Sequence, residues 1–166
     1  MKRRDFIKLA GAGAAIGTLS GLAGCASPVP AKARVVVVGG GFGGATVAKY
    51  IRLWAPTIDV VLVERESAFV SCPISNLVLA GYSGMQDITT GYDGLRRHGV
   101  QVVRDEAVAI DAAKRTVRLA RGGDIAYERL VVSPGIDFNF GEIQGYEAAM
   151  QSGRVLHAWK AGAQTV

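Results

Sequence analysis

The sequence predicts a three-layer α/β fold built from a βαβ unit, a β-meander and a return strand. Three observations predict it. A run of four valines near Arg34 leads into a glycine cluster and a helical pattern, and a second apolar run follows. Short alternating segments with a hairpin signal come next, and a last apolar run ends in Pro-Gly. An apolar strand, a helix and another apolar strand in succession favour a parallel sheet, whereas short alternating strands favour antiparallel hairpins.

The first strand is expected at Val35–Val38, because an unbroken β-branched run suits a parallel strand that is covered on both faces. Gly39, Gly41 and Gly44 follow it at the spacing G-x-G-x-x-G. In a dinucleotide-binding turn the first glycine permits the bend, the second lets a pyrophosphate approach the backbone, and the third lets the helix pack on the strand. The N-terminus of the helix offers unpaired N–H groups to phosphates. The spacing therefore predicts a Rossmann-like dinucleotide site.

A second strand is expected at Thr57–Val63, after a helix that Pro56 ends. This strand closes with Glu64, twenty residues past Gly44. A carboxylate at this place can accept hydrogen bonds from both hydroxyls of a ribose. The alternative is a glycine-rich turn beside a solvated glutamate. Arg34 and Lys49 could attract phosphate, although a solvated surface role is the simpler interpretation.

The remaining elements are short, and a hairpin turn at Arg121–Asp124 divides the meander. The last strand stops at Pro134-Gly135 and so resembles the first in ending at a glycine-containing turn. We expect a polar helix at Tyr92–His98 ending at Gly99, and strands at Val100–Arg104, Asp105–Asp111, Thr116–Ala120, Ile125–Tyr127 and Leu130–Ser133.

Residues 1–33 have the parts of an export signal and a tether: a basic start, an apolar stretch at Leu9–Ala23, and small residues at possible cleavage points. The start, RRDFIK, resembles the bacterial twin-arginine consensus, which implies export of a folded protein to the periplasm. The apolar stretch is short and interrupted for a permanent membrane span. The alternative is an amphipathic helix that stays in the fold. The folded domain is expected over residues 34–166.

Leu22–Cys25 also resembles a bacterial lipobox, in which Cys25 becomes a lipidated first residue and so a lipid anchor. The alternative is cleavage at a small-x-small site, Gly24–Ala26 or Ala31–Ala33. Both alternatives stay open. Ser27–Lys32 contains two prolines and is expected to be a short tether.

The charge balance does not predict a nucleic-acid partner. The formal net charge is +5, and the first eight residues contribute +3 of it through four basic side chains and one acid. Basic and aromatic residues are not interleaved as on a nucleic-acid surface. No metal site is expected either, because His98 and His157 stand alone and Cys72 has neither metal-ligand nor C-x-x-C spacing.

Cys72 lies in the most unusual segment, Ser71–Asn76. A single cysteine is usually a buried, inert thiol. Pro73 argues for a loop or the start of a helix, with Ser75 or Asn76 as a possible cap.

Beyond Arg34 the chain resembles the FAD-binding half of two-dinucleotide-domain flavoproteins related to disulfide reductases. YERLVVSPG is similar to their second flavin motif, with Ser133-Pro134-Gly135 in place of the commoner Ala-Thr-Gly. Within that group the likeness is to the flavoprotein subunits of flavocytochrome c sulfide dehydrogenases. The segments that carry it are VVVVGGGFGGATVAKYI, SCPISN, GYDGLRRHGVQVV, YERLVVSPGI and HAWKAGAQTV.

The resemblance implies FAD as the cofactor. In those subunits a cysteine just before a Ser-Asn pair is bonded to the 8α position of FAD, and Cys72 occupies the matching place, so the resemblance implies covalent attachment there. The cofactor-binding residues that it implies are Gly39, Gly41, Gly44, Glu64, Cys72, Ser133 and Gly135.

The resemblance also implies oxidation of sulfide, with electron transfer to a c-type cytochrome partner. The family's sulfide-reactive disulfide lies further along the chain than this sequence reaches, so no catalytic residue is expected within it. The sequence is therefore expected to be incomplete relative to the family, as the N-terminal part of a longer flavoprotein. Two alternatives remain: a sulfide:quinone or NADH-dependent oxidoreductase, and a truncated FAD-binding module without turnover.

Overall fold

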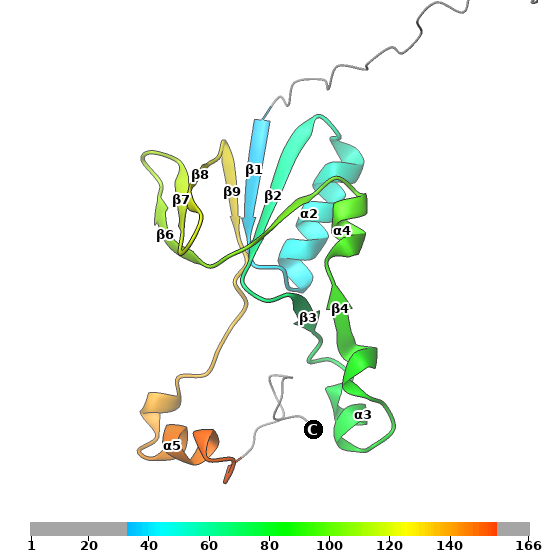
Figure 1. The fold of residues 1–166 in the computed structure, drawn as a ribbon, viewed down its shortest axis with the longest axis vertical. Helices are drawn as coiled ribbons and strands as arrows, with labels where there is room; N and C mark the ends of the chain where they lie inside the picture. The colour runs from blue at the N-terminus through cyan, green and yellow to red at the C-terminus, as the bar shows by residue number, and fades with distance from the viewer. Residues whose placement is uncertain (1–32, 156–166) are drawn as a thin grey trace, which may run out of the picture.

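The computed structural model describes residues 33–155, and its centre is a four-stranded sheet in the order β5-β2-β1-β9 (Figure 1). All three strand pairs are parallel. The strands are β1 (Ala33–Val38), β2 (Ile58–Glu64), β5 (Gln101–Arg104) and β9 (Arg129–Val132). The parallel βαβ unit and the return strand that the sequence predicts are therefore confirmed.

Two further layers cover this sheet (Figure 1). One contains the helices α2 (Phe42–Trp54) and α4 (Asp93–Arg97). The other is an antiparallel meander in the order β6-β7-β8. Its strands are β6 (Ala107–Asp111), β7 (Thr116–Leu119) and β8 (Gly123–Ala126). The expected three-layer α/β fold with a β-meander is confirmed.

The consecutive valines of β1 serve two separate cores, because neighbouring side chains on a strand point to opposite faces. Val35 and Val37 pack in the helix-side cluster with Ala48 and Leu62. Val36 packs in the meander-side cluster, whose other buried members are Val61, Val63, Val117 and Leu119. Burying one such side chain contributes roughly 1.5–3 kcal/mol. The unbroken apolar run is thus explained by cover on both faces.

An arm that the sequence does not predict extends beyond the carboxyl ends of the parallel strands (Figure 1). The short antiparallel pair β3 (Ala68–Val70) and β4 (Thr89–Gly91) forms its base. Between these strands lie α3 (Ser75–Leu79) and the 3-10 helix η1 (Met85–Ile88). Beyond β9 the chain forms the 3-10 helix η2 (Phe140–Glu142) and α5 (Tyr146–Gln151).

The cap expected at Ser75 or Asn76 is wrong. α3 begins after Ile74, which has the left-handed φ of 67°, and no side chain caps the helix. The Ser75 N–H instead donates to the carbonyl of Cys72 at 3.0 Å, so backbone geometry alone starts this short helix.

The meander strands differ from their expected bounds by one or two residues. β6 begins at Ala107 rather than Asp105, because the Asp105 carboxylate accepts the N–H of Glu106 at 2.8 Å and turns the chain. β7 ends at Leu119 and β8 begins at Gly123, two residues before the expected Ile125, so the hairpin turn spans residues 120–122 rather than Arg121–Asp124. α4 matches its prediction, with Tyr92 and His98 as flanking caps and Gly99 at φ +80°.

Several expectations lie outside the described residues: the export signal, the lipobox cysteine Cys25, His157 and the final motif HAWKAGAQTV. Within residues 33–155 every helix is too short or too polar to cross a membrane. Over the same range no three His, Cys, Asp or Glu side chains gather where they could hold a metal ion.

Candidate functional site

The glycine turn follows β1 at the carboxyl edge of the sheet. Gly39 has φ +98°, and a Cβ on it would lie 2.1 Å from the carbonyl oxygen of Ser133. Its N–H donates to the carbonyl of Val63 at 2.9 Å. The ends of three neighbouring strands therefore meet at Gly39. This position requires glycine, because its φ is positive and a side chain would have no room.

Gly44 lies in the first turn of α2, where the helix packs against the glycine turn. A Cβ on Gly44 would be 1.9 Å from the carbonyl oxygen of Gly39 and 3.2 Å from Val37 Cγ1. Its glycine allows the helix to pack directly on the turn, which is the role predicted from its spacing.

Gly41 differs from these two glycines because its surroundings are open. It is the N-cap of α2, and a Cβ there would meet only Phe69, at an ordinary 3.5 Å. No side chain caps α2, and its first turn contains no acidic residue. The N–H groups and the positive end of this 13-residue helix are thus left for an anion, with free space in front of Gly41.

Glu64 lies beside the turn, as predicted. One carboxylate oxygen accepts the N–H of Gly40 at 2.6 Å, and the other accepts the N–H of Glu66 at 2.8 Å. These two backbone bonds fix the orientation of a half-buried carboxylate at the end of β2. The second lone pair on each oxygen remains able to accept a ribose hydroxyl.

Ser133 and Gly135 approach the same turn from β9. The Ser133 N–H donates to the carbonyl of Val38 at 2.8 Å, and its Oγ would be 2.8 Å from a Cβ on Gly43. Gly135 has φ +81° and open space around its Cα. A cleft of about 370 Å³ is lined by Gly39, Glu64 and Gly135 together.

Cys72 lies in the arm, between β3 and α3, and is partly buried. It lines neither the cleft at Gly39 nor the neighbouring groove at Gly41. The described structure thus brings together six of the seven predicted cofactor-binding residues and places Cys72 on a separate element. Its role in binding stays a prediction.

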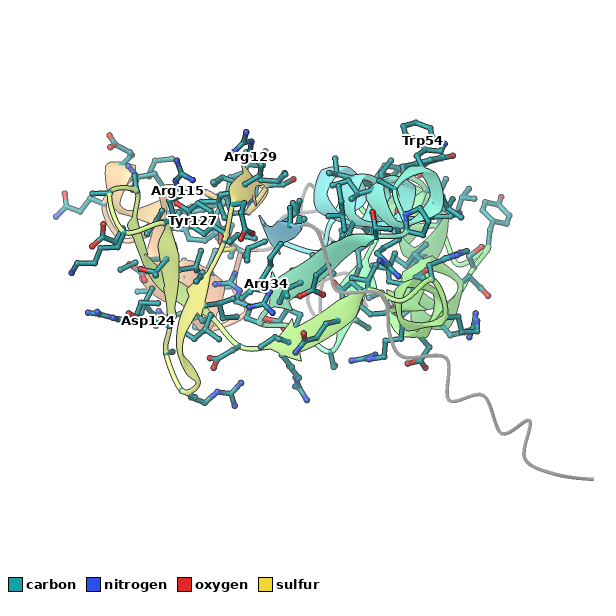
Figure 2. The ribbon with its side chains drawn as sticks, turned by 90° about the horizontal axis from the view of Figure 1, so that it is seen from above. Arg34, Trp54, Arg115, Asp124, Tyr127 and Arg129 are labelled. Carbon is teal, nitrogen blue, oxygen red and sulfur yellow. The ribbon has the colours of Figure 1, made fainter. Side chains whose placement is uncertain are left out.

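Arg34 is at the wrong end of β1 to attract a phosphate at the turn. Figure 2 looks onto the end of the sheet where β1 begins, and shows Arg34 there, with Arg129 and Trp54. Its guanidinium pairs with Asp59 at 2.7 Å. Lys49 lines the groove beside α2, with its Nζ 5.8 Å from the centre of the Tyr50 ring.

Two residues near the turn were not predicted. A Cβ on Gly40 would lie 2.6 Å from the hydroxyl of Tyr92, so this tyrosine packs directly on the turn. Burial, then the charges of Glu64 and Glu66, raises the pKa of Tyr92 to about 12. The available signal of a bulky neighbour was Gly40 itself, a glycine between Gly39 and Gly41 at a position where the G-x-G-x-x-G pattern allows any residue.

The second is Asp105, which is buried at the end of β5 and lines the cleft. It accepts the N–H groups of Glu106 and Arg121 at 2.8 and 3.2 Å. Burial raises the pKa of Asp105, but these bonds and the Arg121 side chain outweigh burial and hold it below its usual value. Asp105 thus joins the parallel sheet to the β7–β8 turn.

Comparison with known proteins places these features in a family context. The flavoprotein chain of a sulfide dehydrogenase (flavocytochrome c) from Chlorobaculum thiosulfatiphilum is 67% identical over 45 residues, which are 27% of this chain and 94% of that short sequence. A probable ferredoxin reductase of Castellaniella defragrans is 34% identical over 63% of this chain and 27% of its own length.

The crystal structure of the sulfide:quinone oxidoreductase from Aquifex aeolicus superimposes with a TM-score of 0.64 at 29% identity, over 69% of this chain and 27% of that one. The chain therefore spans about a quarter of the length of these two larger relatives. The model of the family described as pyridine nucleotide-disulphide oxidoreductase matches residues 33–164. This match covers the whole described fold and its glycine turn, and the chain belongs to the pyridine nucleotide-disulphide oxidoreductase family.

Proposed function

We propose that residues 34–166 form an FAD-binding portion of a flavoprotein that oxidises sulfide and passes the electrons to a c-type cytochrome. The observation that carries this proposal is the 67% identity with a flavocytochrome c sulfide dehydrogenase flavoprotein chain. The structural likeness to a sulfide:quinone oxidoreductase supports the substrate, although that protein's name indicates a different electron acceptor. Because the chain spans about a quarter of the larger relatives, the activity belongs to the whole protein.

The residues at the turn fit the adenosine diphosphate part of FAD. The open backbone at Gly41 and the uncapped N-terminus of α2 suit a pyrophosphate, and the oriented carboxylate of Glu64 suits a ribose diol. Gly135 lines the same cleft, and Ser133, which follows β9, lies against the glycine turn. When bound, FAD supplies the ability to accept two electrons together and release them singly.

We further propose that Cys72 attaches the flavin covalently. The support is the position of Cys72 three residues before Ser75-Asn76, as the resemblance requires, on an arm beyond the carboxyl edge of the sheet (Figure 1). The chain contains only one other cysteine, Cys25, and this lies in the expected export signal. A sulfide-reactive disulfide like that of the resembled subunits would therefore come from residues other than those of this sequence.

The compartment that we propose is the periplasm. The twin-arginine-like start, RRDFIK, supports export of the folded, flavin-loaded protein, and Cys25 supports a lipid anchor as an alternative to cleavage. Covalent attachment would suit this route, because the cofactor could not be lost during export.

The test is the sulfide-dependent reduction of an acceptor by the full-length gene product. Reduction of a c-type cytochrome, without reduction of a ubiquinone analogue, is the expected result. Preferential reduction of the quinone would replace the proposal with the sulfide:quinone alternative, and flavin reduction by NADH but not by sulfide would replace it with an NADH-dependent enzyme. A protein that binds FAD and reduces no acceptor from either donor would be the non-catalytic module.

A further inference from the structure

Tyr92 is a buried residue whose hydroxyl lies next to the glycine turn. Tyr92 is only 6% exposed. It immediately precedes α4 and faces α2 across a groove. The groove has a volume of about 320 Å³ and is lined by Tyr92 together with Gly40, Gly41 and Phe42, the residues at the N-terminus of α2. A Cβ on Gly40 would be 2.6 Å from the Tyr92 oxygen, so this hydroxyl lies at the turn.

This hydroxyl has no hydrogen-bond partner among residues 33–155. The backbone carbonyl of Tyr92 accepts the N–H groups of Leu95 and Arg96, but no described group bonds its side-chain oxygen. A buried tyrosine hydroxyl normally has a partner, because burying an unsatisfied polar group is unfavourable. The pKa of about 12 keeps the group protonated, and therefore a donor, throughout the physiological pH range.

An anionic oxygen of a ligand bound at the turn would provide the missing acceptor. The uncapped start of α2 already favours an anion there, and the open side of Gly41 lets it approach the backbone. Glu64 is not the partner: its two oxygens accept the N–H groups of Gly40 and Glu66, and neither is hydrogen-bonded to the Tyr92 hydroxyl in the described residues.

We propose that the Tyr92 hydroxyl donates a hydrogen bond to a phosphate oxygen of the pyrophosphate of the bound dinucleotide. The inference rests on the FAD binding proposed above, and it adds a side-chain donor to the backbone donors of α2. A hydrogen bond to a charged acceptor is among the stronger ones in proteins, so its loss should be measurable in affinity.

The test compares ADP with adenosine as ligands of the flavin-free full-length protein, for wild type and Tyr92→Phe. Phenylalanine keeps the ring that packs on Gly40 and removes only the oxygen. We expect the affinity for ADP and for FAD to fall about tenfold or more, since hydrogen bonds to charged groups have that order of effect. The affinity for adenosine, which has no phosphate, should not change. Tyr50→Phe is the matched control, because Tyr50 is exposed near the other end of α2 and packs on Trp54.

Unchanged ADP affinity in Tyr92→Phe would overturn the inference while leaving FAD binding intact. An equal loss for ADP and adenosine would also overturn it, because it would show a loosened turn rather than a lost phosphate contact. A wild-type protein that binds neither FAD nor ADP would overturn both the inference and the proposed cofactor.

A second measurement needs no variant, in case Tyr92→Phe fails to fold. A hydroxyl proton held by a phosphate exchanges slowly enough to appear in the proton NMR spectrum of the wild type. Its appearance with ADP but not with adenosine would support the inference, and the same signal with both ligands would overturn it.

Discussion

The backbone of Gly39 lies directly against the backbone of Ser133: a Cβ on the glycine would be 2.1 Å from the serine carbonyl oxygen and 2.9 Å from Pro134 Cα. These residues follow β1 and β9, which are far apart in the sequence and adjacent in the sheet. The predicted glycine turn and the predicted second flavin motif therefore form one structure, and a change in either moves the other.

Gly39→Ala should destabilise the protein strongly. The added Cβ would overlap backbone atoms, and alanine is also unfavourable at a φ of +98°. The steric overlap and the backbone strain together suggest a loss of roughly 2–4 kcal/mol in the free energy of unfolding. Urea denaturation followed by circular dichroism measures it. Gly91→Ala is the control, because a Cβ there meets nothing within 4 Å, and it should change stability by less than about 1 kcal/mol. Equal stability of the two variants would contradict the close contact at Gly39.

Glu64→Gln should weaken the binding of adenosine, ADP and FAD alike, by about tenfold. The amide keeps one acceptor oxygen but loses the charge that strengthens the hydrogen bonds to a ribose diol. Titration of the flavin-free protein by calorimetry measures all three ligands. This pattern differs from that expected for Tyr92→Phe, which spares adenosine. Glu66→Gln, whose side chain is 68% exposed, should bind all three normally, and a similar loss in that variant would argue against a specific role for Glu64.

Cys72→Ser should release the flavin when the full-length protein is denatured. The serine hydroxyl is a much poorer nucleophile than a thiolate, so a covalent bond to the flavin would not form. Acid precipitation separates the two cases: the wild-type pellet should stay yellow, and the variant should leave its flavin in the supernatant. Cys25→Ser should retain its flavin like the wild type, since Cys25 lies in the expected export signal. Flavin retained in the pellet of the Cys72 variant would refute covalent attachment at this residue.

Asp105→Asn should reduce stability at neutral pH, and the difference from the wild type should shrink in acid. The folded state lowers the pKa of Asp105 from its usual 3.8, so its ionised form stabilises the fold above that pH. This contribution is lost as the pH falls through the lower, folded-state pKa. Urea midpoints of both proteins at pH 7 and at a series of values below pH 4 measure it. Asp93→Asn is the control: the Asp93 side chain is 83% exposed, and its loss should show no comparable dependence on pH. A difference in urea midpoint between Asp105→Asn and the wild type that stays constant with pH would contradict the prediction.

The parts of the fold that could be predicted have signals within a few residues. Four consecutive valines indicate a strand that is covered on both faces, and the spacing of Gly39, Gly41 and Gly44 indicates a turn between a strand and a helix. Glu64 could be placed because a parallel neighbour strand brings its carboxyl end to the same edge.

The arm could not be predicted, because β3 and β4 have only three residues each and show no alternation. The same limit applies to contacts that depend on the tertiary fold. Nothing near Tyr92 in the sequence indicates that its ring would pack on Gly40, and nothing near Asp105 indicates a bond to the β7–β8 turn. Cys72 is a different case: the sequence resemblance singles it out, and the geometry of the described residues leaves its role a prediction.

The pairing of β1 with β2 also limits how this family can change by insertion and deletion. Val36 lies opposite Val61, and Val38 opposite Val63, so that Glu64 follows one residue beyond the last pair. A single residue inserted into β2 would either exchange the side chains of the two cores or carry the carboxylate past the turn. Length changes in this protein are therefore expected in the arm and the meander hairpins, whereas β2 can vary only by substitution.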